Sequence, residues 1–153
     1  MKRILLLIVA VSFIGVVAAQ AQEVMPIYVE GKVSPKPLKG QFTIVNKSLQ
    51  AMPVTVEPHQ LSMVNGQPKF GPVDSTTQIE LKDTSAVIPP KSSRTFDYKV
   101  RCQNDCMVTF LSGMVTGRTK EGVQVKLWLM HSVYECSEVK DCRVRMKKAA
   151  NLD

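Results

Sequence analysis

The stretch Val123-Gln124-Val125-Lys126-Leu127-Trp128-Leu129-Met130-His131-Ser132-Val133-Tyr134 alternates in side-chain character from one residue to the next. Its odd-numbered positions carry valine, leucine and one histidine, whereas its even-numbered positions mix polar residues with Trp128, Met130 and Tyr134. Successive side chains of a strand point to opposite faces, so this period of two predicts a β-strand with one face toward a core. The stretch therefore favours an all-β fold.

Shorter segments of the same kind precede this strand and are separated by turn residues. The predicted strands are 27–33, 41–46, 52–57, 61–64, 67–70, 76–82, 95–102 and 107–115. Asn65-Gly66 tolerates the positive φ angles of a tight hairpin, and Glu57-Pro58-His59-Gln60 is typical of a turn. Seven to nine short strands with regular turns and no long helix predict an antiparallel β-sandwich.

The first 21 residues have the order of a secretory signal peptide. Lys2 and Arg3 are followed by an apolar run, Ile4 to Val17, and then by the small-x-small site Ala19-Gln20-Ala21. An uncleaved anchor is the alternative, but the run is shorter than the roughly 20 residues that span a bilayer. We therefore expect cleavage after Ala21, a periplasmic or secreted location, and no membrane span in what remains.

Cleavage would leave 132 of the 153 residues and would lower the net charge from +7 to +5, because Lys2 and Arg3 leave. We expect one sandwich domain over residues 22–136, since this length suits a single core. Residues 137–153 form a basic C-terminal segment in which the period changes, so a short helix is predicted there. The mixed charge elsewhere favours a solvated helix face over a nucleic-acid site.

Four cysteines lie in the C-terminal part of the chain: Cys102, Cys106, Cys136 and Cys142. An even number in an exported chain predicts two disulfides, and three pairings are open. Two local pairs need no particular tertiary arrangement and are favoured over pairings that tie the C-terminus to an earlier strand. The rival interpretation is a periplasmic metal-binding protein with Cys and Met ligands, although the methionines are scattered singly like core filler.

Known catalytic motifs are absent from the sequence. It has no nucleophile elbow, P-loop, HExxH or dinucleotide fingerprint, and only two histidines, His59 and His131. His131 falls on the apolar face of the last strand, where a hydrogen-bonded, partly buried imidazole is a simpler interpretation than a general base. We therefore expect a protein that is not an enzyme and that needs no cofactor.

Two segments resemble a known family. Phe42-Thr43-Ile44-Val45-Asn46 followed by Pro53-Val54-Thr55-Val56, and the proline turn Ile88-Pro89-Pro90-Lys91-Ser92-Ser93-Arg94-Thr95-Phe96, are similar to the N-terminal, immunoglobulin-like domain of periplasmic pilus-assembly chaperones of the PapD-like type. The resemblance implies an immunoglobulin-like β-sandwich that binds a partner by strand addition. Lys32 and Lys126 lie in roughly comparable strands to the anchoring residues of that family but do not match its motif.

The even-numbered face of the last strand is the candidate partner surface. Trp128, Met130 and Tyr134 would form an exposed stripe that docks another protein. The alternative is that the C-terminal segment, held by the nearby cysteines, buries them. We expect a protein partner, chaperone-like or structural in cell-surface assembly, while its identity and the oligomeric state stay open.

Overall fold

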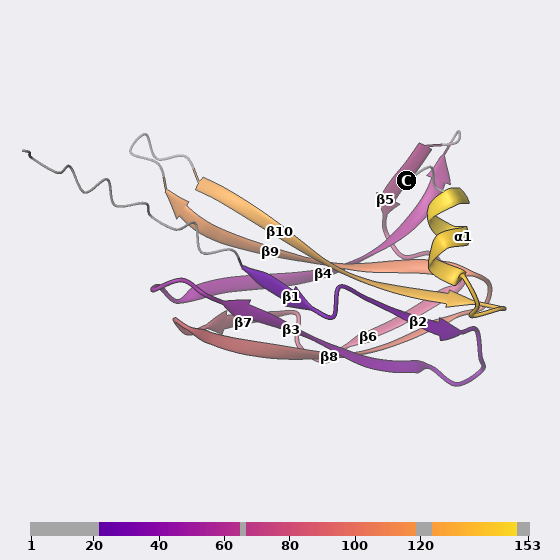
Figure 1. The fold of residues 1–153 in the computed structure, drawn as a ribbon, viewed down its shortest axis with the longest axis horizontal. Helices are drawn as coiled ribbons and strands as arrows, with labels where there is room; N and C mark the ends of the chain where they lie inside the picture. The colour runs from indigo at the N-terminus through magenta and orange to yellow at the C-terminus, as the bar shows by residue number, and fades with distance from the viewer. Residues whose placement is uncertain (1–21, 65–66, 119–123, 150–153) are drawn as a thin grey trace, which may run out of the picture.

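The computed structural model describes residues 22–64, 67–118 and 124–149, which form two packed β-sheets and one short helix (Figure 1). The four-stranded sheet has the order β1-β3-β8-β6, and the six-stranded sheet has the order β2-β10-β9-β4-β5, with β7 also pairing with β4. The elements are β1 (Glu23–Met25), β2 (Tyr28–Lys32), β3 (Leu38–Asn46), β4 (Met52–Val64), β5 (Gln67–Gly71), β6 (Thr77–Leu81), β7 (Ser85–Ile88), β8 (Ser92–Cys102), β9 (Cys106–Arg118), β10 (Gln124–Cys136) and α1 (Cys142–Ala149).

The predicted all-β sandwich is confirmed, and residues 22–64, 67–118 and 124–149 form ten strands where seven to nine were predicted. The turn predicted at Glu57–Gln60 was wrong, because β4 runs without a break through both predicted strands 52–57 and 61–64. Pro58 is tolerated because its nitrogen faces away from β9. Val56 N, which faces the same way, bonds Thr84 O at 2.8 Å, and Pro58 lies between the parts of β4 that pair with β7 and β5.

The chain crosses from one sheet to the other between β1 and β2, at the cis Met25–Pro26 peptide bond. β1 pairs antiparallel with β3, whereas β2 pairs parallel with β10. The pairing with β2 covers only Ser132–Cys136 of β10. This short second strand therefore borders one end of β10 and leaves the other end without β2.

Aromatic rings fill the space between the sheets. Phe42 stacks on Phe96 and on Phe110, with ring centroids 5.4 Å and 5.6 Å apart. Tyr98 packs against Phe110 at 4.8 Å, and the His131 ring lies 4.9 Å from Phe42. These five side chains are at most 2% exposed, so the inward face predicted for the last strand does reach the core.

The short C-terminal helix predicted from the change of period is α1, which lies at the end of the sandwich opposite the start of β10 (Figure 1). A second apolar cluster beneath it contains Met107, Tyr134, Cys136 and Cys142. None of the helices in the described ranges has the length and apolar character needed to cross a membrane. The predicted signal peptide 1–21, the Asn65-Gly66 turn and Val123 lie outside the described residues.

Candidate functional site

The unpaired edge of β10 is the main candidate site. β9 pairs with β10 along one side, but on the other side β2 pairs only from Ser132 onward. Within the described part of the chain, residues 124–131 therefore have a strand on one side only. We call these eight residues the β10 free edge. An extended segment of this length is about 26 Å long, which is enough for a partner strand.

Backbone direction along the β10 free edge follows from one hydrogen bond. Ser132 N donates to Ile27 O at 2.9 Å, so this N–H points away from β9. Because the N–H groups of a strand alternate in direction, those of Lys126, Trp128 and Met130 point the same way, toward the side without a strand. A partner strand would meet these three donors and the carbonyls of the same residues.

The even-numbered face of the β10 free edge is exposed. Trp128 is 47% exposed and Met130 is 51% exposed. The Trp128 ring lies against Gly113 on β9, where an added Cβ would come within 2.7 Å of the ring. The indole therefore lies across the sheet and presents a broad apolar face, of the kind that anchors protein partners.

Tyr134 does not belong to this surface, which corrects the predicted three-residue stripe. Its side chain is 3% exposed because it packs with Met107, Cys136 and Cys142 in the cluster beneath α1. The alternative of burial under the C-terminal segment thus holds for Tyr134 and fails for Trp128 and Met130. The described part of that segment, up to Ala149, packs on the end of β10 that β2 already borders.

His131 is a buried hydrogen-bonded residue rather than an open catalytic base. Its Nδ1 lies 2.6 Å from Pro26 O, and its Nε2 lies 3.0 Å from the Tyr98 hydroxyl. A carbonyl can only accept, so Nδ1 carries the hydrogen and Nε2 accepts the Tyr98 hydroxyl. Burial lowers the pKa of His131, against the opposing effect of the Pro26 bond, and raises the pKa of Tyr98 to about 12. The imidazole is therefore neutral, and it ties the β1–β2 crossing to β8.

The four cysteines form two local pairs, Cys102 with Cys106 and Cys136 with Cys142. Their Cα atoms lie 6.2 Å and 5.9 Å apart, within the range for disulfides. The pairs belong to different apolar clusters, so the four sulfurs do not meet at one centre as the metal interpretation requires.

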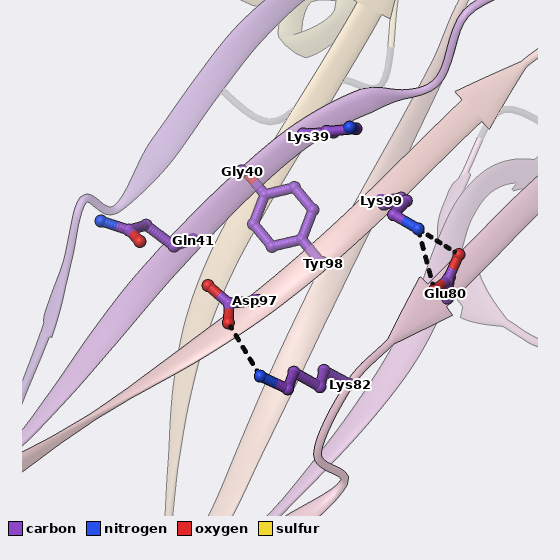
Figure 2. Close-up of a pocket in the computed structure, with 8 residues that line it drawn as sticks. All are labelled: Lys39, Gly40, Gln41, Glu80, Lys82, Asp97, Tyr98 and Lys99. Atoms are coloured by element: carbon purple, nitrogen blue, oxygen red, sulfur yellow. Dashed lines mark hydrogen bonds and ion pairs between the residues drawn. The ribbon is translucent and has the colours of Figure 1, made fainter.

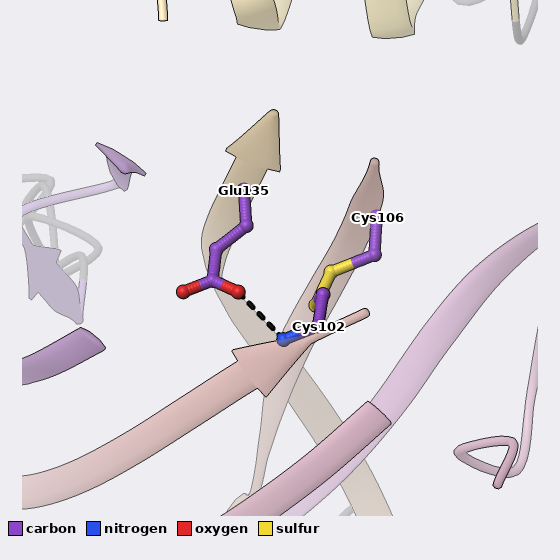
Figure 3. Close-up of side chains that lie close together, drawn as sticks. All are labelled: Cys102, Cys106 and Glu135. Atoms are coloured by element: carbon purple, nitrogen blue, oxygen red, sulfur yellow. Dashed lines mark hydrogen bonds between the residues drawn. A yellow bond between two sulfur atoms is a disulfide. The ribbon is translucent and has the colours of Figure 1, made fainter. Parts of the chain in front are cut away.

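Sequence reasoning missed Glu135, a carboxyl on the inward face of β10 that is 1% exposed. One of its carboxylate oxygens and the sulfurs of Cys102 and Cys106 all lie within 4.8 Å of one another (Figure 3). The alternation of the last strand could have predicted that Glu135 is buried, because it continues the odd-numbered apolar face that contains His131 and Val133. Its contact with Cys102, which lies 33 residues earlier, could not be predicted from the spacing of nearby residues.

A depression of about 560 Å³ opens on the four-stranded sheet (Figure 2). It is lined by Lys39, Gly40, Gln41, Glu80, Lys82, Asp97, Tyr98 and Lys99. Four of its five charged side chains pair with one another, Lys99 with Glu80 at 2.9 Å and Lys82 with Asp97 at 4.0 Å. Exposed pairs of this kind leave little net charge to select an ionic ligand, and they contribute little to stability.

Lys32 and Lys126 do not form a joint site. Lys32 is at the end of β2 that pairs with Cys136, and Lys126 is near the start of β10. Ten residues of strand separate the two levels, which is about 33 Å. The structure therefore gives no common anchor for one ligand group from these two lysines.

Comparisons with known proteins find solved structures with a similar fold. No family model and no curated protein matches the sequence. Among solved structures, the class 5 fimbriae chaperone CfaA is similar with a TM-score of 0.60 at 10% identity, over 77% of this chain and 57% of that chain. A chain of the CsuC–CsuE chaperone–tip adhesion subunit complex of Acinetobacter baumannii matches with a TM-score of 0.53 at 10% identity, over 75% of this chain and 57% of that one.

The Salmonella enterica complex of the SafA pilin with the SafB chaperone also contains a similar chain, with a TM-score of 0.55 at 5% identity, over 77% of this chain and 55% of that chain. This chain thus spans little more than half the length of the solved chains that it resembles. At these identities the likeness establishes architecture. The chain has the immunoglobulin-like β-sandwich fold found in PapD-like pilus chaperones.

Proposed function

We propose that this protein is an exported, non-enzymatic binding module that takes a strand of a protein partner onto the β10 free edge. The observation that carries the proposal is the one-sided pairing of residues 124–131. The exposed Trp128 and Met130 on the same segment support it, because they add apolar contact area beside the unpaired backbone. Chaperone complexes with adhesion and pilin subunits among the similar structures support a protein partner.

Strand addition predicts an alternating pattern of amide protection. In the free protein, the amides of Lys126, Trp128 and Met130 should exchange quickly with solvent, while those of Leu127 and Leu129, which face β9, should exchange slowly. Binding of a partner strand should slow the first three and leave the other two unchanged. Hydrogen exchange followed residue by residue by NMR measures both sets in one experiment.

The partner itself can be captured with a photo-crosslinking amino acid placed at Met130. A matched control carries the same amino acid at Val87 on β7, which is 67% exposed and lies far from β10 in the sheet order. The expected result is a crosslink from position 130 alone, and the crosslinked segment, made as a synthetic peptide, should then give the exchange pattern above. A partner that binds without slowing the three outward amides would refute strand addition.

Two variants at one position separate backbone pairing from side-chain contact. Met130→Pro removes an N–H that points to the unpaired side and leaves the bonds to β9 in place, whereas Met130→Ala keeps that N–H. We expect the proline variant to abolish peptide binding and the alanine variant to weaken it. Equal binding by both variants would mean that the backbone is not used.

The predicted export is tested separately. The N-terminal residue of the protein recovered from outside the cytoplasm should be Gln22, as cleavage after Ala21 requires. Recovery of the uncut chain in the membrane fraction would instead support the anchor.

A further inference from the structure

Glu135 lies at a junction of three strands. It is directly opposite Cys106 in the pairing of β10 with β9, and it reaches across to Cys102 at the end of β8. Glu135 is 1% exposed, Cys102 is 2% exposed and Cys106 is 5% exposed. A carboxyl group is thus enclosed with a disulfide, at the end of the sandwich where β8 turns into β9 (Figure 3).

The two carboxyl oxygens of Glu135 have different environments. Oε2 accepts a hydrogen bond from Cys102 N at 2.7 Å, whereas Oε1 is buried and has no hydrogen-bond partner. Burial raises the pKa of Glu135, against the opposing effect of the Cys102 bond, so the protonated form is favoured relative to a carboxyl in water. The protonated carboxyl then lies beside the disulfide, because one of its oxygens is within 4.8 Å of both sulfurs.

A structural role for Glu135 explains its hydrogen bond to Cys102 N but not why the residue is an acid. A neutral amide would accept the Cys102 N–H equally well, so this hydrogen bond does not by itself require an acid at position 135. The two sulfurs also differ, because the Thr77 hydroxyl donates to Cys102 Sγ at 3.9 Å. The hydroxyl donor therefore lies at Cys102 Sγ alone, whereas the Glu135 carboxyl lies near both sulfurs.

We propose that Cys102–Cys106 is an exchange-active disulfide and that Glu135 is the acid that protonates Cys102 when the bond opens. The co-reactant is a dithiol. Its thiolate attacks Cys106 Sγ, because the Thr77 hydroxyl beside Cys102 Sγ favours Cys102 as the leaving sulfur. A sulfur–sulfur bond forms to Cys106, the bond to Cys102 breaks, and the electron pair goes to Cys102 Sγ, which takes the proton of the Glu135 carboxyl.

The second thiol of the co-reactant completes the exchange. As a thiolate it attacks its own partner sulfur in the mixed disulfide, so the dithiol becomes a disulfide and Cys106 leaves as a thiolate that takes a proton from water. Two electrons pass from the dithiol to the protein, and Glu135 is reprotonated from solvent. This activity is independent of the β10 free edge, so either proposal can fail without the other.

The second disulfide of the same chain is an internal control. Cys136 and Cys142 are also buried, at 1% and 0% exposed. Among the described residues, no third acidic or histidine group completes a cluster with them of the kind that Glu135 makes with Cys102 and Cys106. A difference in reactivity between the two bonds therefore reports on more than general burial.

The test uses the oxidised full chain with dithiothreitol as the dithiol. Samples are alkylated at intervals, and peptide mass spectrometry follows each disulfide separately. We expect Cys102–Cys106 to open at least about tenfold faster than Cys136–Cys142, since acid catalysis by a positioned group is typically worth 10²–10⁴-fold. Glu135→Gln should slow the opening of Cys102–Cys106 by at least about tenfold and leave Cys136–Cys142 unchanged.

The direction of the change separates acid catalysis from a structural role. The glutamine keeps an acceptor for Cys102 N but cannot supply the proton, so catalysis by Glu135 predicts slower opening. A purely structural role predicts unchanged opening, because the glutamine keeps that acceptor, or faster opening where the replacement loosens the turn. Unchanged or faster opening in Glu135→Gln overturns the proposal. If that variant does not fold, the wild-type comparison decides, and equal or slower opening of Cys102–Cys106 overturns it.

Discussion

The hydrogen bond between His131 and Tyr98 can be tested by a double-mutant cycle. His131→Phe keeps a ring stacked on Phe42, whose centroid is 4.9 Å from that of His131, and removes both nitrogens. It leaves the Tyr98 hydroxyl and Pro26 O without their partner. Tyr98→Phe removes only the hydroxyl, which leaves His131 Nε2 without a donor. In the double variant, Pro26 O alone has lost its partner.

The magnitudes follow from the number of polar groups left unpaired. Each one costs about 1–3 kcal/mol when buried, and Pro26 O belongs at the low end because its residue is exposed. His131→Phe should therefore lower the free energy of unfolding by about 2–4 kcal/mol and Tyr98→Phe by about 1–3 kcal/mol. The double variant should be at least about 2 kcal/mol more stable than the sum of the two losses predicts, because it relieves both the unpaired Tyr98 hydroxyl and the unpaired His131 Nε2.

Urea denaturation of the four proteins measures this coupling. Tyr134→Phe combined with His131→Phe is the matched control, because Tyr134 lies beneath α1 and has no hydrogen bond to His131 among those of the described residues. The control pair should be additive within about 0.5 kcal/mol. If the losses in unfolding free energy for His131→Phe and Tyr98→Phe also add within about 0.5 kcal/mol, the hydrogen bond between Nε2 and the Tyr98 hydroxyl and the assigned tautomer are both refuted.

Three further predictions concern the same core and the neighbouring sheet. Burial lowers the pKa of His131, so the unfolded chain binds a proton at a higher pH than the folded protein does. The free energy of unfolding should therefore be highest above about pH 6.5 and should fall as the pH drops through the lower native pKa. Urea midpoints measured for His131→Phe should lack this fall. Gly40→Ala should cost about 1–3 kcal/mol, since its Cβ would overlap the enclosed Tyr98 ring, and an unchanged thermal midpoint would contradict this. Gly113→Ala should lower the free energy of unfolding by less than about 1 kcal/mol and shift the Trp128 fluorescence, because the indole is 47% exposed and can move away from the new Cβ. A loss of stability as large as that of Gly40→Ala would contradict this, because it would mean that the indole cannot move.

The face on which each β10 side chain from Lys126 onward lies could be predicted from the sequence alone. Alternation is a property of neighbouring residues, and a strand converts it directly into two faces. His131 and Val133 are accordingly buried, and Trp128 and Met130 are exposed. The all-β class and the helical end of the chain follow from the same local periods. A secretory leader and two disulfides are likewise predictions from local order and cysteine count.

Contacts between distant segments were decided only by the tertiary structure. β4 continues through Pro58 because its nitrogen faces the interval between β7 and β5, which local turn propensity does not register. Tyr134 and Trp128 share a face in the sequence, yet only Tyr134 is covered, because α1 packs over that end of the sheet. Glu135 reads as one polar residue at the end of an apolar face until the fold places it against Cys102. The physical reason is the same in each case, since burial and hydrogen bonding depend on what the chain brings from far away, whereas alternation depends only on adjacent residues.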